Sequence, residues 1–404
     1  MVRAAMLAQW ELESQAKRSI QTMQYFDCRL GHFHLRWGYQ TLVLAHYWGC
    51  PNDVGSMSWF CSALGGRKLV KADGKVFYPC QETVRQSVEA FILARALLKL
   101  QEVWPDCQAD TPLTEGQLLA AGYGSPQELL VVLTRVVVDE IYSVPEYAEG
   151  ENMYTDTSAH LRSRNSLQGL MREAIILQYA REAVRHADGV RMLRVYKLTL
   201  PRFLGYGAFN YSGEITRELC KLYGLYSPSE SFNGIHDRFY TESSRPGHAV
   251  EKDLHMEHII GTVKDQVQGN PNLNMELVAQ KTETAELYRQ IVKRTDAALE
   301  TAFSGRRHTA KDDTRDVRRA AAHLISSRIF TDPVAVTKHL RGSRKNISEI
   351  AAEKISNGYF EKILTDAYTY GSYWLEEDEL FAEDERNPID LRDGVLNVEE
   401  LNES

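Results

Sequence analysis

The stretch DLHMEH, residues 253–258, places Asp253, His255, Glu257 and His258 within six positions. Carboxylates and imidazoles are common metal ligands and general acids or bases, so a metal or acid–base site is one interpretation. The other is the solvated first turn of a helix, because Asp253 suits an N-cap and acids there are stabilised by about 0.3–1 kcal/mol. A zinc protease is excluded, since its H-E-x-x-H motif needs histidines four positions apart.

The helix expected over residues 253–267 has an apolar side, which predicts that this side enters the core. Glu257 would border the apolar side, where it would be partly desolvated and within reach of Lys264 on the same strip. The apolar positions recur at intervals of four, three and four residues: Met256, Ile260, Val263 and Val267.

His32 and His34 form a second candidate pair, in LGHFHLRWG. The segment FDCRLGHFHL looks like a strand, and residues two apart on a strand face the same way. As metal ligands the two imidazoles would need a carboxylate or a third histidine from elsewhere in the chain, and a purely structural pair is the alternative. Candidate metal ligands from the two motifs together are Asp253, Glu257, His34 and His258.

A third set of residues follows in HADGVRMLRVYKLTL and GAFNYSGEITREL. Asp188 with Gly189 indicates a helix end or a turn, and Ser212 suits a helix start. No Walker loop, serine nucleophile elbow or dinucleotide-binding fingerprint occurs, so those nucleotide-binding and hydrolase classes are excluded.

Basic residues gather in RRHTAKDDTRDVRR, residues 306–319, where six bases alternate with three aspartates. Such alternation is typical of a helix surface laced with ion pairs, and a nucleic-acid-binding surface is the sharper hypothesis. The candidate phosphate-contacting residues are Arg306, Arg307, Arg315, Arg318 and Arg319.

The formal charge of −8 over 404 residues is concentrated at one end of the chain. Residues 375–404 hold 12 acids and 2 bases, which predicts a disordered acidic tail and leaves the rest of the chain slightly basic. An acidic total is therefore no argument against a DNA partner. We expect a helix over residues 1–25, a single large domain over 26–374 and the tail over 375–404.

Six dispersed cysteines without a C-x-x-C pair favour a reducing compartment, either nucleus or cytoplasm. No apolar run has the length of a membrane-spanning helix, and no secretory signal is recognisable, so no membrane partner is expected. No small-molecule cofactor is evident from the motifs either.

Helical periodicity dominates the remaining chain and predicts a mostly α fold with a minor β component, of the α+β class. Apart from FDCRLGHFHL, a strand pattern occurs in GGRKLVKADGKVFYP, with Asp73-Gly74 as a hairpin signal. Helices are expected over 3–22, 35–49, 81–104, 126–142, 160–186, 212–224, 253–267, 275–300 and 311–329.

Five segments in this order resemble a known family: GHFHLRWG, ADGVRMLRVYKLTLPRF, FNYSGE, HDRFYTESSRPGHAVEKDLHMEH and IIGTVKD. They are similar to the large domain of unknown function 6589, found mainly in fungi and in some animals. The resemblance covers about residues 26–300 and is most specific from Arg238 to Lys264.

Members of that family look similar to transposase cores derived from mobile elements. The resemblance therefore implies a degenerate RNase-H-like core with helical additions as a finer alternative for the fold. By that analogy Glu257 is the last of three acids, Asp253 lies beside it and Asp188 is a further ligand of Mg²⁺ or Mn²⁺. Two such ions would activate water for phosphodiester cleavage. His32, however, stands where the family pattern has an aspartate.

Three hypotheses follow for the function. The first is a non-catalytic protein derived from a mobile element that retains a nucleic-acid- or protein-binding role. The second is a divalent-metal-dependent phosphodiesterase that uses Asp188, Asp253 and Glu257. The third is a decayed gene product without a selected function.

Overall fold

The computed structural model describes residues 29–64, 77–107, 112–142, 159–241, 246–267, 313–330, 347–362 and 365, and some positions between 280 and 295. The chain divides into two compact units, Met1–Lys354 and Ile355–Ser404. The helix expected over 1–25, the Asp73-Gly74 hairpin, Arg306, Arg307 and the acidic tail lie outside the described residues.

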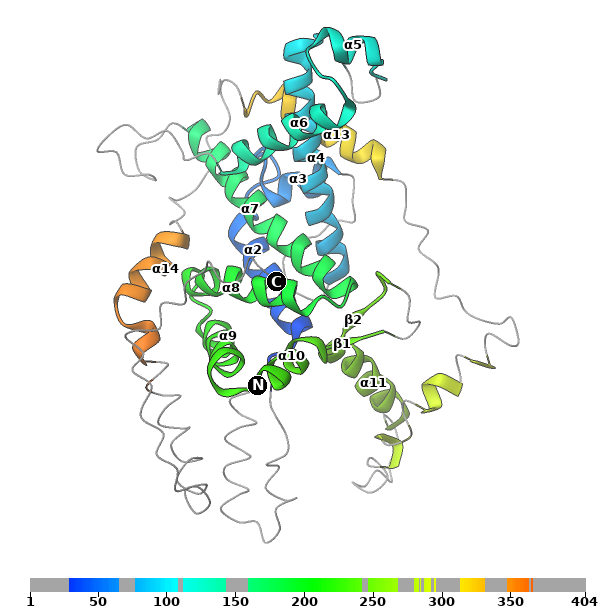
Figure 1. Cartoon of the computed structure of the whole chain (residues 1–404), viewed down its shortest axis with the longest axis vertical. Helices are drawn as coiled ribbons and strands as arrows, with labels where there is room; N and C mark the ends of the chain where they lie inside the picture. Colours follow the sequence, from blue (N-terminus) through cyan, green and yellow to red (C-terminus); the bar gives the residue numbers. More distant parts are fainter. Residues whose placement is uncertain are drawn as a thin grey trace. The chain divides into compact units, whose positions relative to one another are not determined.

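Helices make up nearly all of the regular structure that is described (Figure 1). The helices and strands are α2 (His32–Tyr47), α3 (Met57–Ala63), α4 (Phe77–Val103), α5 (Glu115–Ala120), α6 (Pro126–Tyr142), α7 (Ala159–Arg185), α8 (Gly189–Gly205), α9 (Phe209–Cys220), the π-helix η2 (Lys221–Leu225), α10 (Pro228–His236), β1 (Phe239–Tyr240), β2 (Val250–Glu251), α11 (Lys252–Val267), α13 (Thr314–Ser326) and α14 (Ile347–Ser356).

The prediction of a mostly α fold with a minor β component is confirmed. In the described part of the chain, the strands are β1 and β2, an antiparallel pair in which Phe239 lies opposite Glu251. An RNase-H-like core is built around a larger sheet, and none is evident among these residues. None of the described helices combines the length and the apolar character needed to cross a bilayer.

Several helices begin and end close to the predicted positions, namely α2, α4, α6 and α7. The strand predicted for FDCRLGHFHL is wrong where the structure describes it, because α2 begins at His32. The sequence pattern does not predict helix α8, because the helix contains Pro201 and follows an Asp-Gly pair that is typical of a turn. That pair instead forms the start of the helix.

The core is formed by α2 with α7, and α7 in turn packs on α4, α6 and α8. Helix α2 contributes fully buried Leu35, Tyr39 and Val43, which follow one another at intervals of four residues along one side of the helix. Helix α13 packs along α4 and buries Val317 and Leu324 there. Helix α2 therefore offers a buried element against which its neighbours pack.

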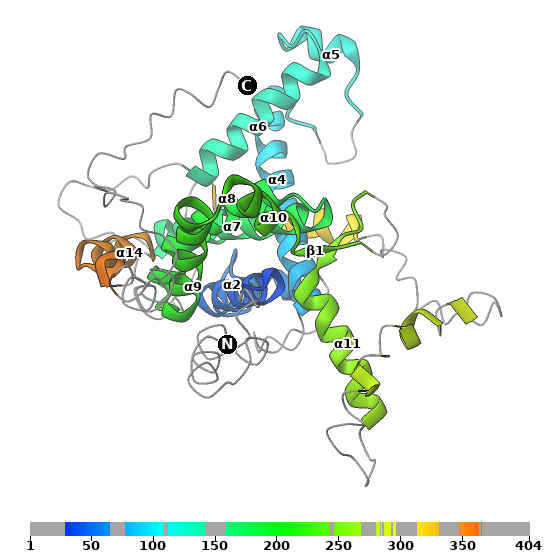
Figure 2. The ribbon, with the colours of Figure 1, turned by 60° about the horizontal axis from the view of Figure 1, so that its bottom comes forward.

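The apolar side of α11 does not enter the core, which corrects the prediction from periodicity. Met256 and Ile260 are 48% and 40% exposed, whereas Leu254 and His255 are buried. Helix α11 packs beside α2 and the strands (Figure 2). Periodicity identifies the apolar side of a helix, but the neighbouring elements decide which residues they cover.

Helix α6 is held in a fixed orientation by one buried carboxylate. Glu140 accepts hydrogen bonds from Arg164 at 2.8 and 2.9 Å and from Gln168 at 3.1 Å, and it forms an ion pair with Arg95 at 3.3 Å. Its side chain is 3% exposed. A buried ion that loses its partner is costly, so this carboxylate and its arginines stabilise each other.

Replacing Glu140 by alanine is expected to lower the free energy of unfolding by about 3 kcal/mol, because it leaves two arginines facing an empty buried site. Urea denaturation measures this value. The matched control is Asp139→Ala, one residue earlier and exposed, for which we expect a change below about 0.5 kcal/mol. Equal effects of the two substitutions would contradict the anchoring role.

Candidate functional site

The first turn of α2 and the first turn of α11 meet through Asp253. Its Oδ1 accepts a hydrogen bond from the Phe33 amide and its Oδ2 one from the His34 amide, both at 3.1 Å. The first amides of a helix have no partner inside the helix, and the N-cap residue Gly31 has no side chain to supply one. Asp253 therefore caps α2 from 219 and 220 residues away in the sequence.

Gly31 makes this approach possible. A Cβ atom at this position would overlap the carboxylate of Asp253. The backbone of Gly31 is extended, with φ −72° and ψ 133°, so the requirement is for space rather than for an unusual conformation. The prediction that Asp253 caps its own helix is wrong, since α11 begins one residue before it. The negative charge instead lies at the positive end of the α2 dipole.

His34 lies between the two carboxylates of DLHMEH. Its Nδ1 is 3.0 Å from Asp253 Oδ2, and its Nε2 is 3.7 Å from Glu257 Oε1. Because a carboxylate only accepts, the proton on Nδ1 is donated to Asp253. The three side chains are 33%, 21% and 46% exposed in the order His34, Asp253, Glu257. His258 is exposed on the next position of α11.

The donor set in this cluster does not fit the two-metal site that the resemblance implies. The two nitrogens of His34 point in different directions, and Asp253 Oδ2 already accepts from two donors. Asp188 belongs to another set of contacts: it is the N-cap of α8 and accepts from the Arg191 amide at 2.8 Å. Within the described residues, no three histidine, cysteine or acidic side chains are grouped to hold a metal ion. The metal and catalytic roles of these residues stay predictions.

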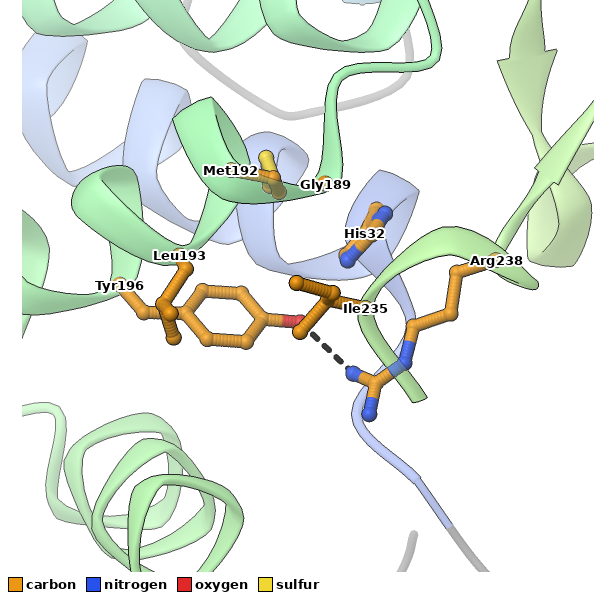
Figure 3. A pocket seen from close by; sticks show the side chains of 7 residues that line it. All are labelled: His32, Gly189, Met192, Leu193, Tyr196, Ile235 and Arg238. Atoms are coloured by element: carbon orange, nitrogen blue, oxygen red, sulfur yellow. Dashed lines mark hydrogen bonds between the residues drawn. The ribbon is translucent and has the colours of Figure 1, made fainter. Parts of the chain in front are cut away.

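His32 points away from His34, into a small buried pocket (Figure 3). Two residues apart on a helix, the imidazoles diverge, so the expectation that they face the same way is wrong. His32 is 2% exposed and packs against the rings of Tyr196 and Phe239, with centroids 5.7 and 5.0 Å away. The pocket has no room for the centre of a water molecule.

The pKa of His32 is held well below its ordinary value of 6.5. Burial is the largest cause, and the positive charges of Arg238 and Arg36 add to it. His32 Nδ1 and Arg238 Nε have no hydrogen-bond partner among the described residues. The imidazole is therefore neutral in the folded protein, which suits a packing residue beside two arginines.

Both arginines are neutralised by carboxylates from other elements. Arg238 bonds to Glu218 of α9, to the Tyr196 hydroxyl at 2.8 Å and to the Leu30 carbonyl at 3.1 Å (Figure 3 shows the Tyr196 bond). Arg36 forms a buried ion pair with Glu251 of β2. These contacts tie α2, α8, α9 and the strands together around His32.

Most of these residues have no direct signal in the amino-acid sequence. Arg36, Glu218 and Glu251 look like ordinary surface charges in a one-dimensional pattern, yet all three are at most 5% exposed. A second buried set links Tyr39, Glu173 and Arg202, where burial raises the pKa of both Tyr39 and Glu173. One usable signal was present: Arg36 and Glu173 interrupt apolar stretches of helices that must be buried.

The basic cluster is described in part. Arg315 and Arg318 are exposed on α13, and Arg319 donates to the Ala63 carbonyl at 2.9 Å and to Asp316 at 3.0 Å. Arg318 also has an interaction within the structure. The structure thus brings three of the five candidate arginines together on one side of a helix.

Comparison with known proteins adds a family but no function. Residues 4–308 match the family of unknown function DUF6589, which agrees with the resemblance carried by the motifs. No curated protein and no solved structure matches the chain.

A double-mutant cycle tests the cap. Asp253→Ala removes the partner of two amides and is expected to lower the free energy of unfolding by about 1–2 kcal/mol. Gly31→Ala is expected to be less destabilising in the Asp253→Ala background than in the wild type, because the overlap with the carboxylate is then removed and only the Cβ of residue 253 stays close, at 3.1 Å. Chemical denaturation of the four proteins gives the coupling, and strictly additive effects would contradict the contact. Glu257→Gln serves as the exposed control in the same turn of α11.

The buried state of His32 makes stability depend on pH. Since the folded pKa is lowered, the unfolded chain binds more protons below pH 6.5, and stability is lost as pH falls through this value. Between pH 7.5 and 5.5 we expect wild type to lose about 1.4 kcal/mol relative to His32→Gln. Taking the difference between the two proteins cancels the opposite trend from Glu173, whose pKa is raised. Parallel pH profiles would be the contrary result.

Proposed function

The chain belongs to the family of unknown function DUF6589, so the family suggests no activity and we propose a function from the residues of this chain. We propose that it is a non-catalytic protein that binds nucleic acid through α13. The origin from a mobile element, implied by the resemblance, accords with such a role. The observation that carries the proposal is the exposed arginine side of α13.

Helix α13 is amphipathic, with an apolar side against α4 and a basic side toward solvent. Arg315, Arg318 and Arg319 lie at i, i+3 and i+4, so their side chains share one side of the helix. Arg319 is anchored to α3 through the Ala63 carbonyl, which fixes the rotation of α13 about its axis. Its buried residues are Val317, Ala320, Ala321 and Leu324.

The acids near this surface that the structure describes are already engaged. Asp313 is paired with Arg85 and accepts from Gln86 at 2.7 Å, and Asp316 accepts from Arg319. Arg315 has no partner among the described residues. Among the described residues, Arg315 and Arg318 therefore present positive charge to solvent on this side of α13. Arginine binds phosphate oxygens through its planar group, which suits a nucleic-acid backbone.

The alternative function, a phosphodiesterase that uses Asp188, Asp253 and Glu257, lacks comparable support. Asp188 and Asp253 each cap a helix, and Glu257 faces the imidazole of His34. Carboxylates committed to backbone amides have fewer lone pairs to offer a divalent ion.

Binding of a fluorescent DNA duplex, followed by anisotropy at several salt concentrations, tests the proposal. We expect binding at low salt (about 20 mM) that falls steeply as salt rises, because phosphate contacts release counterions. Replacing Arg315 and Arg318 by alanine is expected to reduce the slope of log K against log salt by about 2, one for each lost phosphate contact.

The matched control removes two positive charges from another exposed helix, with Arg194→Ala and Lys197→Ala on α8. Its slope is expected to stay near that of the wild type. Absence of binding even at low salt, or equal losses in both double variants, would contradict a specific role of α13.

A further inference from the structure

A second contact between α2 and α11 lies one helical turn after Asp253 and brings two hydrogen-bond acceptors together. The Nδ1 proton of His34 is donated to Asp253, so Nε2 of the neutral ring carries a lone pair. This Nε2 lies 3.7 Å from Glu257 Oε1, and a carboxylate also only accepts. Neither atom has a hydrogen-bond donor among the described residues. A positively charged species between the two atoms would remove their repulsion.

The separation of these two atoms favours a metal ion over a proton. A hydrogen bond between a ring nitrogen and a carboxylate oxygen spans about 2.7–3.2 Å. Two ligands that bind zinc at about 2.1 Å with a tetrahedral angle lie about 3.4 Å apart. At 3.7 Å, His34 Nε2 and Glu257 Oε1 are closer to the second separation than to the first. An ion therefore fits between them with a smaller movement than a hydrogen bond requires.

Asp253 gives the imidazole the support that metal-binding histidines use. A histidine that binds a metal through one nitrogen donates its other N–H to a carboxylate, a carbonyl or water, which fixes the tautomer and the ring orientation. Asp253 lies 3.0 Å from His34 Nδ1, and its carboxylate is held in turn by the Phe33 and His34 amides. The ring therefore presents Nε2 to Glu257 in a fixed direction.

The ligand types favour Zn²⁺ over Mg²⁺. Imidazole nitrogen suits Zn²⁺, whereas Mg²⁺ prefers oxygen ligands. His34 is 33% and Glu257 46% exposed, so an ion can enter from solvent and water can complete its coordination. In the described part of the chain no third protein ligand is grouped with these two. The ion therefore exchanges with solvent more readily than one held by four protein ligands.

We propose that His34 Nε2 and Glu257 Oε1 bind one Zn²⁺ ion between α2 and α11, with Asp253 orienting the imidazole and water molecules as the remaining ligands. The ion joins the two helices a second time, one turn after the Asp253 cap. It differs from the two-ion Mg²⁺ site implied by the resemblance, because Asp188 has no part in it and Asp253 supports a ligand instead of binding the ion. This inference stands independently of nucleic-acid binding.

Isothermal titration calorimetry of the full chain with zinc chloride at neutral pH tests the site. The wild type is expected to bind one Zn²⁺ ion more than His34→Ala, because the thiols and the other imidazoles are the same in both proteins. Glu257→Ala is expected to show the same loss. The matched control is His236→Ala, which removes an imidazole from α10 whose Nδ1 lies 2.9 Å from the Phe232 carbonyl, and it should bind zinc as the wild type does.

NMR of the imidazole nitrogens identifies the ligand atom. The His34 signals are assigned as those missing from His34→Ala. We expect Zn²⁺ to shift the Nε2 signal of this ring while Nδ1 keeps its proton, and an excess of Mg²⁺ to leave both signals unchanged. Circular dichroism checks that all three variants are folded.

Equal zinc stoichiometry in the wild type and in either folded ligand variant overturns the proposal. So does a His34 Nε2 that carries a proton and keeps it at saturating zinc, because a proton and not an ion then faces Glu257. Displacement of the zinc by Mg²⁺ would contradict the ligand assignment. Loss of one ion in both ligand variants, with the His236→Ala control intact and the Nε2 signal shifted, supports the site.

Discussion

A helix that begins inside a protein needs partners for its first amides, and in this chain Asp253 supplies them for α2. The contact joins two segments separated by 219 residues in the sequence. Because α2 lies in the core and packs on α7, α11 and α4, its entry angle affects where these helices can pack. The missing side chain of Gly31 and the carboxylate of Asp253 are therefore both required to cap the first turn of α2.

The buried charges around this junction follow from the same constraint. Arg36 lies in α2, Arg238 donates to the Leu30 carbonyl just before it, and each is neutralised by a glutamate from a different element. Such pairs contribute little net stability compared with apolar residues of equal size, but a mispaired arrangement would leave a buried charge alone. They favour one arrangement of α2, α9 and β2, and a neutral His32 fits between them. Within the cluster of acids and imidazoles, Asp253 has a structural role at this junction, and the metal and catalytic roles of the cluster stay predictions.

Periodicity was sufficient to predict α6 and α7 almost to the residue, since their patterns are long and uninterrupted. It failed for His32–Leu35, where three aromatic rings in a row resemble a strand but the remote cap selects a helix. It also failed for Met256 and Ile260, because a periodic pattern cannot show which other elements cover a helix.

The capping role of Asp253 could not be predicted from the sequence, because the helix that it caps lies far away in the chain and no local motif records the contact. The sequence alone identifies the arginines of α13 as a basic cluster. The packing of α13 on α4 is needed to tell which side of the helix is exposed.

Hydrogen exchange of the Phe33 and His34 amides, followed by NMR in the wild type and in Asp253→Ala, tests the central claim most directly. If Asp253 caps α2, both amides are protected in the wild type and exchange much faster in the variant, while amides in the middle of α2 keep their protection. The first amides of an uncapped helix have no other acceptor. Rapid exchange of both amides in the wild type, or equal protection in the two proteins, would contradict the account.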